Sequence, residues 1–164
     1  MKRTFLYLLI ILCLLVCDQV SKSMINHSVP YGSHITVIKG FFNISHVHNR
    51  GAVFGVFNQP GNSLVFYVLT IASLAAFAVV VYYFIKVPTS ETLLKFSLSL
   101  VIAGALGNSL DRLFRGYVID FLDFHINDLH WPSFNVADSC ITIGAVLMVY
   151  LLLFRREVKC SLCS

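Results

Sequence analysis

The chain has 164 residues, of which 57% are hydrophobic and only 12% are charged. Soluble domains are usually about 45–50% apolar and about 25% charged, so this composition excludes an ordinary water-soluble domain and indicates that the excess apolar surface faces lipid. The formal net charge of +4 does not indicate a nucleic-acid partner, because most of the basic residues flank apolar segments. We expect one integral membrane domain over residues 1–164 and no nucleic-acid binding.

Four apolar segments are long enough to cross the hydrocarbon core of a bilayer, which takes roughly 17–25 residues. They predict transmembrane helices over about 4–25, 63–85, 93–110 and 134–154. Basic residues concentrate beside the segment ends on one side, which predicts that both termini and the tail 155–164 are cytoplasmic. These residues are Lys2, Arg3, Lys86, Lys95, Arg155, Arg156 and Lys159. The other five basic residues, Lys22, Lys39, Arg50, Arg112 and Arg115, fall on the opposite side.

The first segment begins like a secretory signal peptide, because Lys2 and Arg3 precede an apolar run. Val16 is bulkier than the small residue expected before a cleavage site at Cys17, so we expect a retained helix. Cys160 and Cys163 form a single Cys-x-x-Cys pair in the tail, which lacks the second half of a zinc site. The sequence gives them no assigned role.

Residues 27–62, between the first two apolar segments, have the composition of strands and turns. Residues 34–38 and 41–48 are rich in β-branched and aromatic side chains, and Gly40 lies between them. We expect a small β-sheet here, lying on the outer surface of the membrane. The second excursion, residues 111–131, joins the last two apolar segments, and we expect its Asp123 and Asp128 to be solvated.

Two carboxylates stand where apolar chain enters or leaves the predicted bilayer. Asp138 lies near the start of the fourth apolar segment, and Asp120 lies in the apolar stretch 117–121. An ionisable group inside a membrane-length segment costs roughly 2.5–3.5 kcal/mol on insertion scales. Two acids in one low-dielectric cavity do not both ionise, so such a pair is able to hold one proton and activate a water.

Other polar residues occupy positions near the same predicted helix ends, and each has a structural interpretation beside the functional one. For Asp111 and Arg112 the simplest interpretation is structural: they pack at the membrane interface and help to fix the topology of the chain. Asp18 either fastens a helix end to a loop or acts directly. Asn135 is either a helix N-cap or the residue that orients Asp138, since residues three apart share a helical face.

His46 and His48 alternate on a predicted strand and would share one face of it. Two ligands without a third nearby make a weak metal site. We expect no metal and no cofactor.

Taken together, these motifs resemble the lipoprotein signal peptidase family, the bacterial signal peptidases II, over essentially the whole chain. The resemblance lies in five stretches in order, which are residues 18–22, 48–55, 104–112, 118–121 and 131–139. Val53 stands where the family commonly has alanine or serine, and the Cys-x-x-Cys tail is not a family feature. Neither departure touches the two acids.

The resemblance implies four transmembrane helices, a periplasmic β-cradle and an aspartic endopeptidase of the bacterial inner membrane. Such an enzyme removes the signal peptide of prolipoproteins just before a diacylglyceryl-modified cysteine, in contact with membrane lipids, and is inhibited by cyclic peptides of the globomycin type. Carried over by motif, Asp120 and Asp138 are the catalytic pair. The positions that shape the site or bind substrate are Asp18, Asn49, Arg50, Gly51, Gly104, Asn108, Asp111, Arg112, Asn135 and Ala137.

Two other classes of protein would also tolerate acids in apolar segments. A proton or ion transporter would use them for transport, but Asp120 lies in an excursion rather than midway across a segment. A four-helix assembly factor would not depend on either acid. Peptide hydrolysis by the purified protein separates the three.

Overall fold

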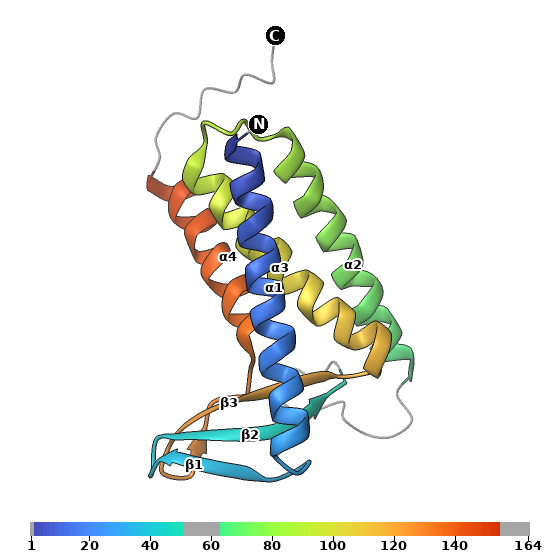
Figure 1. Cartoon of the computed structure of the whole chain (residues 1–164), viewed down its shortest axis with the longest axis vertical. Coiled ribbons are helices and arrows are strands. Elements are labelled where there is room, and N and C mark those ends of the chain that lie inside the picture. The colour runs from blue at the N-terminus through green and yellow to red at the C-terminus, as the bar shows by residue number, and fades with distance from the viewer. Residues whose placement is uncertain (1, 51–62, 155–164) are drawn as a thin grey trace.

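The computed structural model describes residues 2–50 and 63–154 of the chain. Gly51, the rest of the motif at 52–55, and the tail with Cys160 and Cys163 lie outside these residues. Within the described residues, Figure 1 shows a bundle of helices above a small sheet; the helices are α1 (Lys2–Ser28), α2 (Ser63–Lys86), α3 (Thr92–Arg115) and α4 (Val136–Phe154). The start of α1, the end of α4 and the α2–α3 connection lie at the end of the bundle away from the sheet.

Three of these helices are long and apolar enough to cross a membrane: α1, α3 and α4. In α2 the apolar stretch identified among the described residues is the shorter Thr70–Lys86. The helical prediction is thus confirmed for three segments, and the fourth membrane crossing stays a prediction. α3 lies at the centre of the bundle, in contact with α1, α2 and α4. It continues to Arg115, beyond the predicted end at residue 110, and stops at Gly116, whose φ of 76° is the left-handed geometry that glycine adopts without strain.

The sheet is antiparallel and has the strand order β1-β2-β3-β4. β1 (His34–Ile38) and β2 (Phe42–Asn49) confirm the two strands that the sequence predicts. β3 (Val118–Ile126) and the short β4 (Leu129–His130) come from the excursion between α3 and α4, where no strand was predicted. The sheet therefore joins both excursions, and β2 pairs along β3 so that Val47 lies opposite Asp120.

The contact between α3 and α4 depends on glycine. A Cβ atom added to Gly104 would lie 2.2 Å from the backbone oxygen of Ala137, and one added to Gly144 would lie 2.7 Å from the backbone oxygen of Ser97. Small residues allow helix backbones to approach this closely in membranes. The resemblance to the family implies that Gly104 and Ala137 shape the site or bind substrate. In the structure α4 itself occupies the space at Gly104.

We expect Gly104→Ala to destabilise the protein by about 1–3 kcal/mol, the usual range for overpacking. The added methyl group must push Ala137, and with it the first turn of α4, away from α3. Thermal unfolding in detergent measures the loss, and the control is Ala75→Val, which adds two methyl groups on the exposed face of α2. Equal melting temperatures for Gly104→Ala and the unmodified protein would show that this contact is not tight.

Candidate functional site

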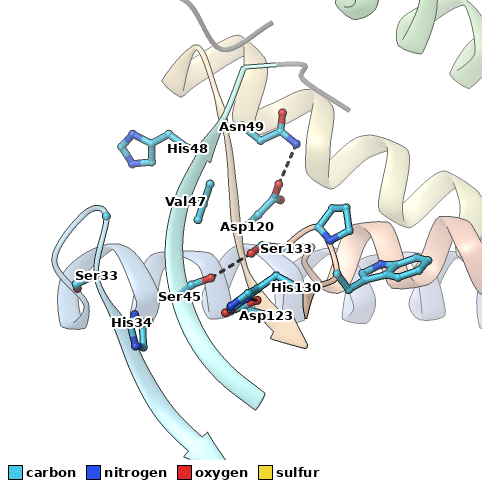
Figure 2. Close-up of a pocket in the computed structure, with 13 residues that line it drawn as sticks. Ser33, His34, Ser45, Val47, His48, Asn49, Asp120, Asp123, His130 and Ser133 are labelled. Carbon is cyan, nitrogen blue, oxygen red and sulfur yellow. Dashed lines mark hydrogen bonds and ion pairs between the residues drawn. The ribbon is translucent and has the colours of Figure 1, made fainter. Parts of the chain in front are cut away.

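Asp120 projects from β3 and is almost completely buried, with 2% of its surface exposed. Both of its carboxylate oxygens accept a hydrogen bond from an asparagine amide. Asn49 Nδ2 donates to Oδ2 at 2.9 Å (Figure 2), and Asn135 Nδ2 donates to Oδ1 at 2.7 Å. Antiparallel pairing of β2 with β3 brings Asn49 to this carboxylate from 71 residues away.

Asp138 lies in the first turn of α4 and is held in the same way by two donors. Asn108 Nδ2, from α3, donates to Oδ1 at 2.7 Å. The backbone N–H of Asn135 donates to Oδ2 at 3.2 Å, while the backbone N–H of Asp138 donates to Asn135 Oδ1 at 2.9 Å. This reciprocal pair is a capping arrangement, in which each of the two side chains satisfies a backbone N–H at the helix start.

Asn135 links the two acids, because its backbone contacts Asp138 and its side chain contacts Asp120. It is fully buried. Both interpretations of Asn135 that the sequence allows therefore describe it: it caps α4 and it holds the acid pair.

The electrostatic setting keeps a proton on this pair near neutral pH. Burial, followed by the nearby charge of Asp138, raises the pKa of Asp120 from 3.8 to about 7, although the amides of Asn49 and Asn135 act in the opposite direction. Burial disfavours the charged form of a carboxyl group, and a neighbouring carboxylate adds repulsion. One of two such acids is therefore protonated over a range that includes pH 6.

The raised pKa of Asp120 has a consequence for stability. A carboxyl group whose pKa is higher in the fold than in the unfolded chain contributes its full stabilisation below about pH 4, and this contribution is lost as the pH rises to about 7. The shift corresponds to at most roughly 4 kcal/mol. We expect Asp120→Asn to raise the melting temperature in detergent above pH 7 and to have less effect at pH 4. Asp128→Asn, in the exposed β3–β4 turn, is the control. A melting temperature lowered equally at both pH values would contradict this.

A second layer of charge lies behind the acid pair, and its centre is Lys22. The sequence placed this residue among the basic groups on the outer side, but the structure buries it completely. Its ammonium contacts Asp18 Oδ2 at 2.9 Å, Asp111 Oδ2 at 2.8 Å and Asn108 Oδ1 at 3.0 Å. Arg115 also pairs with Asp111. The i,i+4 spacing of Asp18 and Lys22 on α1 was the one signal in the sequence.

Asp18 joins α1 to the start of α4. Its Oδ1 accepts the backbone N–H of Ala137 at 2.9 Å, and a negative charge is favourable at a helix N-terminus. The fastening interpretation of Asp18 fits this contact. Gly107 on α3 makes room for it, because a Cβ there would lie 2.5 Å from Asp18 Oδ2. Sequence reasoning did not single out Gly107.

Two cavities reach the acid pair from different sides. One, of about 470 Å³, lies against β2 and the β4–α4 segment, and its wall includes Asp120, Asn49, Ser133 and Trp131 (Figure 2). The other, of about 270 Å³, lies between α2, α3 and α4, and its polar lining consists of Ser73, Asn108, Arg112 and Asp138. Asp120 borders the first cavity and Asp138 borders the second.

Among the described residues, Asp111 forms ion pairs with Lys22 and Arg115 and not with Arg112. The three aspartates 111, 120 and 138 all act on its guanidinium electrostatically. Its Nε is buried and has no hydrogen-bond partner among the described residues. Arg112 therefore places positive charge beside the helix-lined cavity.

The prediction that Asp123 is solvated was wrong. The sequence placed it in solvent, but it is buried, accepts a hydrogen bond from Asn43 Nδ2 at 3.0 Å and contacts His130 Nδ1 at 2.8 Å. Its neighbour Asp128 is exposed, as predicted. The reason for the difference is β3 itself, whose pairing with β2 sets Asp123 opposite Asn43.

His46 and His48 do share a face, and their Nε2 atoms lie 3.1 Å apart. His46 Nδ1 contacts the backbone oxygen of Val29 at 2.8 Å. Among the described residues, no three His, Cys, Asp or Glu side chains are grouped closely enough to hold a metal ion.

The structure brings most of the proposed site residues together. Around the acid pair and the second layer it gathers Asp18, Asn49, Gly104, Asn108, Asp111, Arg112, Asn135 and Ala137. Arg50 is exposed. It follows β2 directly, one residue after Asn49.

Fold and site together define a helical membrane protein with a buried polar centre where three helices meet a small antiparallel sheet. The model of the family Peptidase_A8, "Signal peptidase (SPase) II", matches residues 10–154. The chain belongs to the signal peptidase II family, and it is therefore a protease.

Relatives and solved structures agree with this assignment. The lipoprotein signal peptidase of Francisella tularensis subsp. novicida is 39% identical over 151 residues, covering 92% of this chain and 93% of its own. The lipoprotein signal peptidase of Burkholderia mallei is 41% identical over 141 residues, covering 85% and 82%. A solved structure described as a bacterial membrane enzyme has a TM-score of 0.75 and 36% identity, and the match covers 93% of this chain and 92% of that one.

Proposed function

We propose that the chain is an aspartic endopeptidase of the bacterial inner membrane, which cleaves the signal peptide from diacylglyceryl-modified prolipoproteins just before the lipidated cysteine. The observation that carries this proposal is the pair formed by Asp120, which is buried, and Asp138, which is half-buried, joined through Asn135. Family membership supports the class of substrate, because the curated relatives bear the name lipoprotein signal peptidase.

In the proposed reaction the pair shares one proton and positions one water. The ionised aspartate takes a proton from that water as it attacks the scissile carbonyl, and the protonated aspartate donates a hydrogen bond to the carbonyl oxygen. The tetrahedral intermediate then collapses, the C–N bond breaks, and the amine of the cysteine leaves with a proton from the pair. No metal or cofactor takes part in this scheme.

The two cavities fit the two halves of such a substrate. The cavity between α2, α3 and α4 is mostly apolar and suits a signal helix within the membrane. The cavity against β2 contains polar groups such as Ser45, Ser133 and Asn49, which suit an extended chain leaving the membrane. The scissile bond would lie between the cavities, beside the acid pair.

The proposed orientation places the sheet on the periplasmic side, four helices across the membrane and both termini in the cytoplasm. Lys86 and Lys95 flank the α2–α3 connection, at the end of the bundle that also holds the start of α1. Positive residues concentrate on cytoplasmic ends, which supports this direction. Membrane lipids then surround the exposed apolar faces of α1 and α4. By resemblance to the family, inhibitors of the globomycin type would occupy the acid pair.

The test is cleavage by purified protein in lipid vesicles. We expect a prolipoprotein with a diacylglyceryl-modified cysteine to be cut into two products whose masses place the cut before that cysteine, with activity retained in the presence of a chelator. The same substrate without the lipid is the matched control and should be cut far more slowly. Ion flux without cleavage would favour a transporter, and neither activity would favour an assembly factor. If a chelator abolished cleavage and zinc restored it, the result would favour a zinc site at His46 and His48.

A further inference from the structure

Lys22 is a buried cation that the two-aspartate scheme does not use. Its side chain has no exposed surface, and its ammonium lies within 3.0 Å of three oxygens, on Asp18, Asp111 and Asn108. The two aspartates and Arg115 balance its charge, so the four ionised side chains sum to zero. Two acids would already be enough to neutralise Lys22. The contact with the neutral Asn108 needs a separate reason.

That contact fixes which way the Asn108 amide points. An ammonium group only donates hydrogen bonds, so the atom of Asn108 that faces Lys22 must be the carbonyl oxygen. The amide nitrogen is then directed to the other side, where it donates to Asp138 Oδ1 at 2.7 Å. Without Lys22 the amide would be able to turn over and accept a hydrogen bond from a protonated Asp138.

The second oxygen of Asp138 is also held by a donor that cannot be exchanged for an acceptor. It accepts the backbone N–H of Asn135 at 3.2 Å. Both oxygens of Asp138 therefore face fixed donors, and hydrogen bonds donated to a carboxylate favour its ionised form.

Asp120 is one step further from the cation. A single residue, Asn108, connects Lys22 to Asp138 by hydrogen bonds. Two residues, Asn108 and Asn135, lie between Lys22 and Asp120. The side chains of these two asparagines are in contact at 3.4 Å, and Asn135 donates to Asp120. The pKa of Asp120, raised to about 7 by burial and by the charge of Asp138, agrees with a proton held on Asp120.

We propose that Lys22 is a positioning residue: its ammonium fixes the Asn108 amide, so that Asp138 is the ionised member of the pair and accepts the proton of the attacking water, while Asp120 carries the shared proton. This assignment rests on the proposed two-aspartate function and adds the identity of each partner. The charged groups around the pair come from α1 (Asp18, Lys22), α3 (Asp111, Arg112, Arg115), β3 (Asp120) and α4 (Asp138).

The test must remove the cation without leaving buried acids unbalanced, because breaking one side of a buried ion pair is strongly destabilising. Lys22→Met combined with Asp18→Asn removes one charge of each sign and leaves the ion pair of Asp111 with Arg115, which is already present in the structure. Lys95→Met is the matched control, because Lys95 is also a buried lysine of the bundle but contacts the backbone oxygen of Phe84 instead.

We expect the double variant to lower kcat about 10²-fold with little change in KM, a loss typical of misplaced reacting groups. The alkaline limb of its pH–rate profile should move to higher pH, because the charge of Lys22 lowers the pKa of Asp120 and that effect is lost. Lys95→Met should keep the profile of the unmodified enzyme. An unchanged profile in a folded double variant would overturn the proposal, as would an equal shift in Lys95→Met.

A measurement on the unmodified enzyme applies even if the double variant does not fold. Carbon-13 NMR of aspartate-labelled protein, with signals assigned through the Asp→Asn variants, should show Asp120 protonated and Asp138 ionised at pH 6. The reverse assignment would overturn the role of Lys22. Failure of the underlying function is distinguishable, since the unmodified enzyme would then cleave no lipid-modified substrate at any pH.

Discussion

Asp120→Asn and Asp138→Asn should each lower kcat for signal-peptide cleavage by at least about 10³-fold, within the upper part of the range for loss of one general acid or base. Asparagine keeps the size of the side chain and one acceptor oxygen, so each variant keeps one of the two hydrogen bonds that its aspartate accepts, while the new NH2 group faces the other donor. What it removes is the ability to exchange a proton. Activity should therefore be lost while the protein remains folded and inserted.

The measurement is single-turnover cleavage of a lipid-modified prolipoprotein, followed by the mass of the released signal peptide. Asp128→Asn removes an exposed carboxylate from the β3–β4 turn and should retain full activity. Melting temperatures in detergent confirm that each variant is folded. A variant of either central aspartate that cleaves at the unmodified rate would refute the acid pair.

The second large effect is on pH dependence. The cleavage rate should fall about tenfold per pH unit above about pH 7, where the raised pKa of Asp120 predicts loss of the last shared proton. The doubly ionised pair still binds water but has no acid to polarise the scissile carbonyl. At low pH the rate should fall again, once both carboxyl groups are protonated and no base remains. Because the two groups interact, the apparent pKa value of each limb belongs to the pair and not to one residue.

The profile is best measured as kcat in vesicles of neutral lipid, so that surface charge does not shift the local pH. A substrate without ionisable groups near the cleavage site ensures that the limbs belong to the enzyme. A rate that stays constant from pH 6 to pH 9 would contradict a shared proton on this pair.

Much of the architecture was predictable because lipid imposes it. The apolar segments had to form helices, since a chain in the hydrocarbon core must satisfy its own backbone hydrogen bonds. The strands β1 and β2 were predictable from β-branched and aromatic residues on either side of Gly40. Asn135 and Asp138 were predictable as neighbours, because three residues at the start of a helix bring them to one side.

The missed features all depend on contacts between residues far apart in the chain. β3 carries Asp120 and Asp123 among apolar residues, and only its pairing with β2 shows that both are buried. Asp123 finds its partner Asn43 80 residues away, which no local pattern reveals.

The burial of Lys22 was missed for the same reason. The positive-inside rule treats every lysine as a surface charge, whereas this one meets Asp111 and Asn108 from another helix. Gly107 was missed because its importance comes from Asp18, which lies against it from α1.

An experimental structure in lipid, at a resolution that shows ordered water, would test whether Asp120 and Asp138 share one water molecule. We expect one water molecule within hydrogen-bonding distance of both carboxyl groups, with Asn135 bonded to Asp120 Oδ1 and Asp138 Oδ2 as it is here. Carboxyl groups that contact no common water, with or without a bound substrate, would contradict it.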